Sequence, residues 1–581
     1  MADDHSGNRS MIVQELNAIQ QKFGYLPEEE LRAFSKRSQI PMYRLHEVAS
    51  FFPHYRLKPP ATGTVLICRD LACHLAGASR LLQTLKATAR ETDERIEVGG
   101  VSCLGQCDRA PALLINDQVI WGQTESQLRA LTRDSVHQRT RGVHDELDKG
   151  PTGWQIDPYE GQPRYEAVGL MLDGELSPEK MIQELELSGL FGLGGAGGAT
   201  HGKWSEVRKE PGATKYIVCN ADESEPAAFK DRELLLRVPH LVIEGMTLAA
   251  LTVGAEKGYL YIRHEYHDQI AAVEAALAEA RERGILGQRI LGSDRTFELE
   301  VFISPGGYIC GEQTALLEAM EDRRAEPRNR PPQPMKAGLW GCPTVLNNVE
   351  TLAWTPAIAL KGGKWYAGLG VNGATGMRFV SISGDVKRPG VYELPFGGTV
   401  GELIKHAGGL KGTQSVQAIA PSGPSGGFLP ARLRVDQVSR KFAERFFTGG
   451  RTEMSILDLP LDKPTMRMLD VPLLSAVVVI GSEANLLDLA KNCLEFYRNE
   501  SCGKCVPCRI GSQKLVEIAE DLIQHHGAMS PQRAEAIDDL ATAMIQTSIC
   551  GLGQVAPLPL TTLMTYFPNL FRKTDLPKTR S

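Results

Sequence analysis

Residues 500–511 read ESCGKCVPCRIG, and this stretch decides how the rest of the chain is interpreted. Cys502, Cys505 and Cys508 stand three residues apart, and Cys550 follows in the segment SICGLGQ. Three closely spaced thiolates with one distant thiolate are typical of the ligands of a [4Fe–4S] cluster. A zinc site, which usually uses two CxxC-type pairs or nearby histidines, is one alternative, and buried structural cysteines are another. The pattern favours the cluster and predicts a protein that moves single electrons.

Length and charge narrow the class of protein. A chain of 581 residues predicts several domains. A net charge of −6 provides no basic surface for nucleic acid. The first ten residues are polar and acidic without an apolar signal core, and the densest apolar run, 473–480, is too short for a membrane span. We therefore expect a cytoplasmic protein with no membrane span and no nucleic-acid partner.

A second set of four cysteines lies near the N-terminus. Residues 11–57 read as helices, and a β-branched strand then ends at Cys68, with Cys73 shortly after it. Another strand leads to Cys103 and Cys107, and residues 112–121 read as a hairpin. The loops would bring four thiolates to one end of a small sheet. Because the gaps do not match the two CxxC knuckles of a zinc ribbon, a [2Fe–2S] cluster is favoured.

A glycine-rich segment, GLFGLGGAGGATHGKW at residues 189–204, follows a helix expected to begin at Ser177. It contains G-x-G-x-x-G at Gly192, Gly194 and Gly197, but a Rossmann fingerprint should leave a strand, and this one leaves a helix. The ordinary Rossmann reading is therefore disfavoured. Such dense glycine still lets backbone approach a flat or phosphorylated ligand, and Lys203 can meet a phosphate. A flexible loop is the alternative.

Polar residues follow the next predicted strand, 215–219. Asn220, Asp222, Glu223 and Glu225 come directly after it, where open α/β sheets bind ligands. An acidic surface loop is the alternative. Further on, a helix begins near Gly311, and we expect that its N-terminal amides could hold an anion.

These motifs resemble two known families. The helical start, the two cysteine pairs and CLGQCDRAP resemble the thioredoxin-like ferredoxin subunit of respiratory complex I. About residues 165–575 resemble its FMN- and NADH-binding flavoprotein subunit, through GLFGLGGAGGATHGKW, CNADESEPAAFKDR, GGYICGEQTALLEAME, PRNRPPQP, GLWGCPTVLNNVET and the ESCGKC…SICGLG cysteines. The fused arrangement is similar to the β subunit of cytoplasmic molybdenum- or tungsten-dependent formate dehydrogenases, and to the diaphorase subunit of NAD-reducing hydrogenases.

The resemblance implies an α/β multidomain fold. The expected units are an N-terminal helical segment (1–58), a thioredoxin-like [2Fe–2S] domain (59–135), a linker (136–164), a Rossmann-like α/β FMN and dinucleotide domain (165–374), a β-grasp domain (375–470) and a C-terminal helical bundle with the [4Fe–4S] cluster (471–581).

The resemblance also implies the cofactors and their ligands. FMN, both clusters and NAD or NADP as substrate are expected, with Glu225 placed over the flavin ring near the nicotinamide. The implied cluster ligands are Cys68, Cys73, Cys103 and Cys107, and Cys502, Cys505, Cys508 and Cys550. The implied cofactor-binding residues are Gly192, Gly194, Gly195, Gly197, Lys203, Asn220, Asp222, Glu223, Tyr308, Gly311, Glu312, Arg330, Asn347 and Asn348.

The chain departs from the family pattern at the adenine end of the dinucleotide site. The motif's two arginines are Phe191 and Leu193, and its carboxylate and lysine are Gln313 and Arg330. The positions of three aromatic residues hold Gly198, Glu206 and Gln333. Since base stacking contributes about 1–3 kcal/mol, dinucleotide binding is expected to be weakened by roughly ten- to a thousandfold.

The main interpretation is a diaphorase subunit that moves electrons between NAD(P)(H), FMN and the clusters within a larger complex such as formate dehydrogenase, with a hydrogenase diaphorase as an alternative. Loss of one carboxylate beside Arg330 would leave room for the 2′-phosphate of NADP. Two further alternatives are a degenerate dinucleotide site, with electrons passing between protein partners such as a ferredoxin or a quinone-linked complex, and an inactive scaffold.

Overall fold

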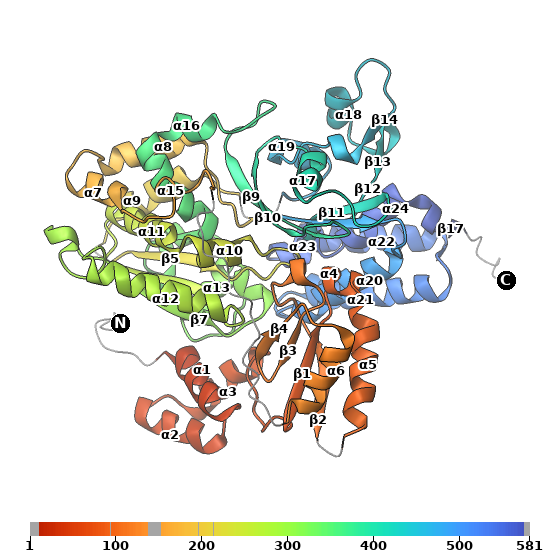
Figure 1. The fold of residues 1–581 in the computed structure, drawn as a ribbon, viewed down its shortest axis with the longest axis horizontal. Helices are drawn as coiled ribbons and strands as arrows, with labels where there is room; N and C mark the ends of the chain where they lie inside the picture. The colour runs from red at the N-terminus through yellow and green to blue at the C-terminus, as the bar shows by residue number, and fades with distance from the viewer. Residues whose placement is uncertain are drawn as a thin grey trace.

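The computed structural model describes residues 11–92, 95–136, 153–195, 197–212, 214–473 and 475–573. The predicted helices of the N-terminal segment are confirmed, and they lie against the next large domain (Figure 1). Side-chain amides of Gln14 and Asn17 donate to the carbonyl of Ile303 at 3.0 and 3.1 Å. The segment is therefore docked on a neighbouring sheet. Its helices are α1 (Ile12–Phe23), α2 (Glu28–Ser38) and α3 (Met42–Phe51).

A four-stranded sheet of order β2-β1-β3-β4 forms the second unit, at the bottom of Figure 1. β1 and β2 are parallel, and the other pairs are antiparallel. The predicted hairpin is confirmed, with Asn116 and Asp117 at positive φ in a two-residue turn. The elements are β1 (Gly63–Cys68), α4 (Leu71–Leu75), α5 (Ala78–Arg90), β2 (Ile96–Val101), η1 (Cys107–Arg109), β3 (Leu113–Ile115), β4 (Gln118–Ile120) and α6 (Glu125–Asp134).

The third unit is built on a parallel sheet of order β7-β6-β5-β8. After β5 the chain passes to β6 and β7 on one side, then returns to place β8 on the other. The predicted cap of α8 is confirmed, because Ser177 accepts from the Lys180 amide. The elements are α7 (Glu166–Leu172), α8 (Pro178–Ser188), α9 (Thr200–Lys209), β5 (Tyr216–Ala221), α10 (Lys230–Arg237), α11 (Pro239–Val253), β6 (Lys257–Arg263), α12 (His267–Glu282), η2 (Ile290–Gly292), β7 (Glu298–Ser304), η3 (Tyr308–Gly311), α13 (Gln313–Met320), α14 (Pro334–Ala337), η4 (Leu339–Gly341), β8 (Thr344–Asn348), α15 (Val349–Lys361) and α16 (Gly363–Ala367).

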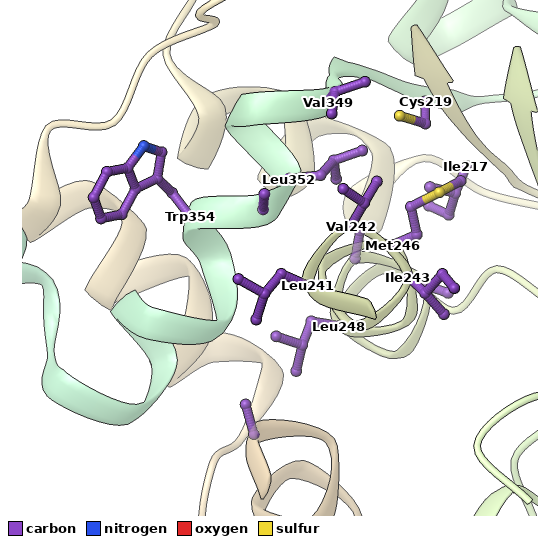
Figure 2. Close-up of a cluster of buried hydrophobic side chains, with 14 of the residues drawn as sticks. Ile217, Cys219, Leu241, Val242, Ile243, Met246, Leu248, Val349, Leu352 and Trp354 are labelled. Atoms are coloured by element: carbon purple, nitrogen blue, oxygen red, sulfur yellow. The ribbon is translucent and has the colours of Figure 1, made fainter. Parts of the chain in front are cut away.

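The core of this unit lies where α11 and α15 pack beside β5. Figure 2 shows Leu241 and Met246 of α11 with Leu352 of α15 and Ile217 of β5 in one cluster. A Cβ on Gly245 would come within 2.1 Å of the Leu352 carbonyl, so glycine is what allows the two helices to approach this closely. This packing fixes the carboxyl ends of β5 and β8 relative to each other.

A five-stranded sheet of order β10-β9-β15-β11-β12 forms the fourth unit. Its strand β15 lies beyond residue 470, so this sheet extends past the boundary that the sequence suggested. The elements are β9 (Met377–Gly384), β10 (Gly390–Pro395), α17 (Val400–His406), β11 (Val416–Pro424), β12 (Leu429–Pro430), β13 (Arg432–Arg434), η5 (Val435–Gln437), α18 (Arg440–Phe446), β14 (Glu453–Ser455), η6 (Ile456–Asp458), α19 (Lys463–Met468) and β15 (Ala476–Gly481).

The last unit is helical and, with the others, confirms the α/β multidomain fold (Figure 1, blue). Among the described helices no single one has the length and hydropathy of a membrane span, although α10 and α11 pass that test together across a 92° bend. The elements are α20 (Leu486–Glu500), α21 (Val506–Gln524), β16 (Ala528–Met529), α22 (Pro531–Thr547), α23 (Gly551–Val555), α24 (Leu558–Tyr566), η7 (Pro568–Leu570) and β17 (Arg572–Lys573).

The predicted linker falls partly outside the described residues, since 137–152 are not described. The part that is described packs on the third unit. Tyr159 is buried and donates from its hydroxyl to Glu244 at 2.9 Å, and the amides of Gln155 and Ile156 donate to Glu393. Residues 153–164 are therefore part of the folded structure.

Candidate functional site

A cavity of about 380 Å³ opens at the carboxyl ends of β5 and β8. The strand order changes direction between these two strands, and such switch points are where open α/β sheets bind ligands. The volume is within the range of small-molecule sites. Every predicted flavin-site residue lines the cavity except Gly197, which lies in the glycine-rich loop. The predicted residues at the wall are Gly192, Gly194, Gly195, Lys203, Asn220, Asp222, Glu223, Glu225, Tyr308, Gly311, Glu312, Arg330, Asn347 and Asn348.

The glycine-rich loop forms one wall. The Gly192 amide donates to the Gly198 carbonyl at 2.8 Å, which closes the loop at its base. A Cβ on Gly194 would come within 2.9 Å of Asn348 Cβ, so the loop backbone packs directly on the end of β8. Gly195 and Gly197 have φ values of +104° and +64°. These conformations favour glycine and leave backbone, rather than side chain, facing the cavity.

Two strand ends supply the amides. Asn220 of β5 and Asn348 of β8 are register partners, and Asn220 donates to the Gly311 carbonyl at 2.9 Å. Asn347 accepts from the indole of Trp204 at 3.0 Å, which fixes its side chain. Asn348 also caps α15 by accepting from the Glu350 amide.

Three buried polar atoms at this wall lack a hydrogen-bond partner among the described residues: Asp222 Oδ1, Glu223 Oε1 and Asn347 Nδ2. Leaving a buried polar atom unpaired costs about 1–3 kcal/mol. A ligand that presents both donors and acceptors would satisfy them. FMN does so through its ring N–H and carbonyl groups and its ribityl hydroxyls, so the residues present fit this cofactor.

Burial also shifts the two acids of the wall. It raises the pKa of Asp222 to about 7, with Arg263 opposing the shift, and the pKa of Glu223 to about 8, with Asp231 adding to it. Glu223 Oε2 accepts from the amides of Asp231 and Arg232 and so holds the first turn of α10. The acidic residues after β5 are therefore enclosed, and the surface-loop alternative is wrong.

Glu225 is held by side chains from three units. Its Oε2 accepts from the hydroxyls of Tyr308 at 2.5 Å and Ser425 at 3.0 Å, and its Oε1 accepts from the Ser425 amide at 3.0 Å. Ser425 in turn contacts the Tyr497 hydroxyl of α20 at 2.9 Å. Burial raises the pKa of Glu225 to about 7, although these hydrogen bonds oppose the shift. Its carboxyl group can therefore hold or release a proton near neutral pH.

The cationic side of the cavity contains Lys203 and Arg330. Burial and the nearby Arg330 lower the pKa of Lys203 to about 8, so it remains mostly protonated at pH 7. Arg330 is paired with Glu312. Because its charge is engaged there, the geometry gives no support to a free 2′-phosphate site at Arg330.

The start of α13 does not offer free amides to an anion. Glu312 is the cap of this helix and accepts from the amides of Thr314 and Ala315, both at 2.9 Å. A carboxylate of the chain itself therefore occupies the position that the sequence suggested for an external anion, and that expectation is wrong.

The three positions at which the family motif has aromatic residues hold Gly198, Glu206 and Gln333. Glu206 and Gln333 are exposed, and Gln333 stands just before α14. Gln313 lines the cavity at the position of the missing carboxylate. Phe191, which stands where the family motif has an arginine, packs on Phe396, and the two ring centroids are 5.2 Å apart.

The first cysteine set is enclosed between units. Cys68, Cys73, Cys103 and Cys107 are each at most 4% exposed, and the sulfur atoms of Cys103 and Cys107 are 3.4 Å apart. The amide of Ala227, two residues after Glu225, donates to Cys107 Sγ at 3.3 Å. The loop that carries the cavity carboxylate therefore also touches a predicted ligand of the [2Fe–2S] cluster.

The second set lies at the end of the helical unit. Cys502 precedes α21, Cys505 is the N-cap residue of this helix, Cys508 is in its first turn, and Cys550 is the N-cap residue of α23. A Cβ on Gly553 would meet Cys508 Cβ at 2.9 Å, so this glycine lets α23 approach α21. Cys550 itself lines the cavity.

No group of three or more His, Cys, Asp or Glu side chains with single-ion spacing occurs in the described ranges. The two sets of four cysteines supply the thiolates that [2Fe–2S] and [4Fe–4S] centres require.

Glu500 ties the units together next to Cys502. It accepts from the Tyr308 amide at 2.8 Å and from the hydroxyl of Ser102, which stands beside Cys103. The Glu500 carboxylate thus links η3 at the cavity wall to a residue beside the first cysteine set, and Glu500 itself stands two residues before the second set.

Some site residues were not predicted from the sequence. Lys230 lies buried at the cavity wall between Asp231 and Glu350, at 2.5 and 3.1 Å. The adjacent charges of Lys230 and Asp231, which precede the buried apolar helix α11, were a signal in the sequence that could have identified this part of the site. Ser425, Pro472 and Ser475 also line the cavity, but they come from a distant part of the chain and carry no local signal.

Four family models match consecutive parts of the chain. They are the thioredoxin-like [2Fe–2S] ferredoxin (residues 1–135), the Nuo51 FMN-binding domain (185–357), the SLBB domain (379–429) and the NADH-ubiquinone oxidoreductase-F iron–sulfur binding region (488–574).

Similar proteins and structures agree with these matches. An NADH-quinone oxidoreductase subunit of Rhizobium meliloti is 38% identical over 419 residues, covering 72% of this chain and 93% of that protein. The NAD-reducing hydrogenase HoxS subunit alpha of Cupriavidus necator is 29% identical over 596 residues, covering 98% and 92%. A crystal structure of NAD⁺-reducing [NiFe]-hydrogenase in the H₂-reduced state superimposes with a TM-score of 0.83 at 30% identity, covering 97% of this chain and 94% of that one.

Proposed function

Because this chain belongs to the FMN-binding flavoprotein family of NADH-quinone oxidoreductases, we propose that its cavity holds FMN and receives the nicotinamide end of NADH. The chain is an NADH-oxidising electron-transfer subunit that uses FMN and two iron–sulfur clusters. A bound flavin supplies the conversion between a two-electron hydride and single electrons.

One observation carries the assignment of the site. A single cavity has Cys550 in its wall, and the Glu225 loop at the same wall donates a hydrogen bond to Cys107. Each predicted cluster therefore has a ligand next to the cavity. This supports a route from the cavity to both cysteine sites.

The residues of the chain would act by binding and orientation. The backbone of Gly192–Gly195 and the amides of Asn220 and Asn347 would hold the flavin, and Lys203 would supply positive charge for its phosphate. Tyr308 and Ser425 would keep Glu225 directed at the reacting end of the cavity. Because α23 supplies Gly551, Leu552 and Val555 to the cavity wall, it would help to exclude water from the cavity.

Anaerobic stopped-flow reduction tests this function. We expect NADH to bleach the flavin absorbance of the purified protein, and NADPH to do so far less effectively. No bleaching by either dinucleotide at millimolar concentration would overturn the proposal and favour electron transfer between protein partners only. Iron and acid-labile sulfide assays on the same preparation would separate that result from an inactive scaffold.

We propose catalytic subunits of a larger redox complex as the partners. Support comes from four exposed apolar side chains beside the second cysteine set and from the full-length likeness to a hydrogenase subunit. The exposed residues are Val506, Ile510, Ile545 and Ile549. A hydrogenase is the partner that this likeness favours, and molybdenum or tungsten formate dehydrogenase is the alternative from sequence. Co-purification with metal analysis for Ni, Mo and W decides between them.

We further propose a cytoplasmic location. None of the twelve cysteines is joined in a disulfide, which is typical of proteins in a reducing compartment.

A further inference from the structure

The glycine-rich segment carries its own lysine, Lys203, only at its end, after the glycines. From Phe191 to Thr200 the sequence contains no basic residue. A lysine from another unit fills this position instead: Lys463 of α19 donates to the Gly197 carbonyl at 2.8 Å, and its ammonium group lies 5.0 Å from the Phe191 ring centroid. A cation over an aromatic face is stabilised by the ring. The loop therefore carries a positive charge that is supplied from more than 260 residues away.

Two lysines flank the same glycine pair. A Cβ on Gly197 would lie 2.9 Å from Lys463 Nζ, and a Cβ on Gly198 would lie 3.5 Å from Lys203 Cε. In the part of the chain that the structure describes, Lys203 Nζ donates to the Leu346 carbonyl and Lys463 Nζ to that of Gly197. Burial lowers the pKa of both ammonium groups, and the nearby charges of Arg330 and Arg467 add to this effect at Lys203 and Lys463 respectively. A bound anion would supply the opposite charge and so favour the protonated form of both lysines.

Lys463 also belongs to a segment that reaches the cavity. The chain runs from α19 to Pro472 and Ser475, which line the cavity wall. One end of this segment therefore touches the glycine loop and the other borders the cavity. The Lys463 side of the glycine loop lies outside the cavity lining, where a part of a nucleotide that extends beyond the cavity could reach it.

We propose that Lys463 is a phosphate-binding residue that completes the nucleotide site, acting with Lys203 across the Gly197–Gly198 turn. The proposal rests on the function proposed above. Lysine binds phosphate as a compact point charge, and backbone N–H groups of a glycine turn add to such a site. The phosphate comes from one of two sources, the diphosphate of the dinucleotide or the monophosphate of FMN.

Three variants separate the effect of the Lys463 charge from the effect of its hydrogen bond to the Gly197 carbonyl. Lys463→Gln keeps a donor for the Gly197 carbonyl and removes the charge, Lys463→Arg keeps the charge, and Arg467→Gln removes a neighbouring charge from the same helix. The binding probe is ADP-ribose, which carries the diphosphate without the nicotinamide, titrated into the FMN-loaded protein. FMN content and the salt dependence of the dissociation constant are measured on the same samples.

We expect Lys463→Gln to raise the dissociation constant for ADP-ribose by ten- to a hundredfold and to reduce its dependence on salt, with Lys463→Arg and Arg467→Gln close to wild type. If Lys463→Gln instead loses FMN while ADP-ribose binding to reconstituted protein is normal, the phosphate is that of the flavin. Wild-type behaviour of Lys463→Gln in both measurements would overturn the proposal. Flavin bleaching of the wild-type protein by NADH, measured separately, shows whether the proposed function itself holds.

Discussion

The two cysteine sites have opposite surroundings. Cys68, Cys73, Cys103 and Cys107 are enclosed, and Cys103 and Cys107 pack with Phe229 of the flavin unit. Around Cys502 and Cys505, in contrast, Val506 and Ile510 are 58% and 50% exposed. The difference teaches that the first site is shielded by other units of the chain, whereas apolar side chains beside the second are open to a partner. We therefore expect the second site, more than the first, to lie at a contact with another subunit.

Removing one ligand from each site should have the largest effect. Cys505→Ala is expected to abolish the electron paramagnetic resonance signal of the [4Fe–4S] cluster and spare that of the [2Fe–2S] cluster, and Cys103→Ala to do the reverse. The reason is that each set is complete within its own unit. Iron analysis and circular dichroism accompany the spectra. Loss of both signals from either variant that remains folded would contradict two separate sites.

The enclosed site should depend on a buried ion pair. Arg232 is 2% exposed and forms a bidentate pair with Asp108, at 2.7 and 3.0 Å, across the boundary of the first cysteine unit. Arg232→Ala removes this bidentate pair and leaves Asp108, which is 10% exposed, with the longer pair to Arg109 at 3.6 Å, so it should destabilise this unit by about 3 kcal/mol. The denaturant midpoint for loss of [2Fe–2S] absorbance measures it.

An exposed pair of the same geometry is the control. Arg434 and Asp436 are 57% and 59% exposed and are also bidentate. Arg434→Ala should change stability by less than about 1 kcal/mol. Equal midpoints for the two variants would show that the first site is not held by Arg232.

The carboxylate between the two sites should give a pH signature in protein stripped of flavin. The pKa of Glu225 in the fold is about 7, above its ordinary value of 4.5. The folded protein then keeps a proton that the unfolded chain releases, so stability falls as pH rises through this window, by up to about 3 kcal/mol from this group. Glu225→Gln should reduce that decline, and unfolding curves at pH 5 and 8 measure it.

Asp222 and Glu223 also have raised pKa values, so part of the decline should remain in this variant. A Glu225→Gln protein with the same difference between pH 5 and pH 8 as wild type would show that Glu225 is ionised in the fold.

A substitution on the exposed apolar surface beside the second cysteine set should change the free energy of unfolding little but weaken binding of the partner subunit. Ile510→Glu changes a half-exposed helix residue, so the free energy of unfolding should move by no more than about 0.5 kcal/mol. Binding of the partner subunit should weaken about tenfold or more, measured by its retention during purification of the complex. Leu187→Glu, on the exposed face of α8, is the matched control and should retain the partner. Loss of the partner from both variants, or from neither, would contradict a partner contact at this face.

Features that lie within short segments could be predicted from the sequence, because residue spacing and strand ends are local. They include the two cysteine sets, the N-cap at Ser177 and the polar residues that follow β5. The long-range partners could not be predicted in this way. β15 joins the five-stranded sheet across an insertion, and Lys463 reaches Gly197 from another unit. Glu312 shows a different limit: its cap on α13 is local, but glutamate is not among the usual N-cap residues, so no sequence pattern indicated it.

The cavity belongs to no single unit of the chain. Its walls come from the parallel sheet, from Ser425 and Pro472 of the five-stranded unit, and from Cys550 and Val555 of the helical unit. A newly made chain whose last hundred residues have not yet docked lacks one of these walls. We therefore expect it to bind flavin more weakly than the complete chain, so that full cofactor affinity is reached only after the helical unit has docked.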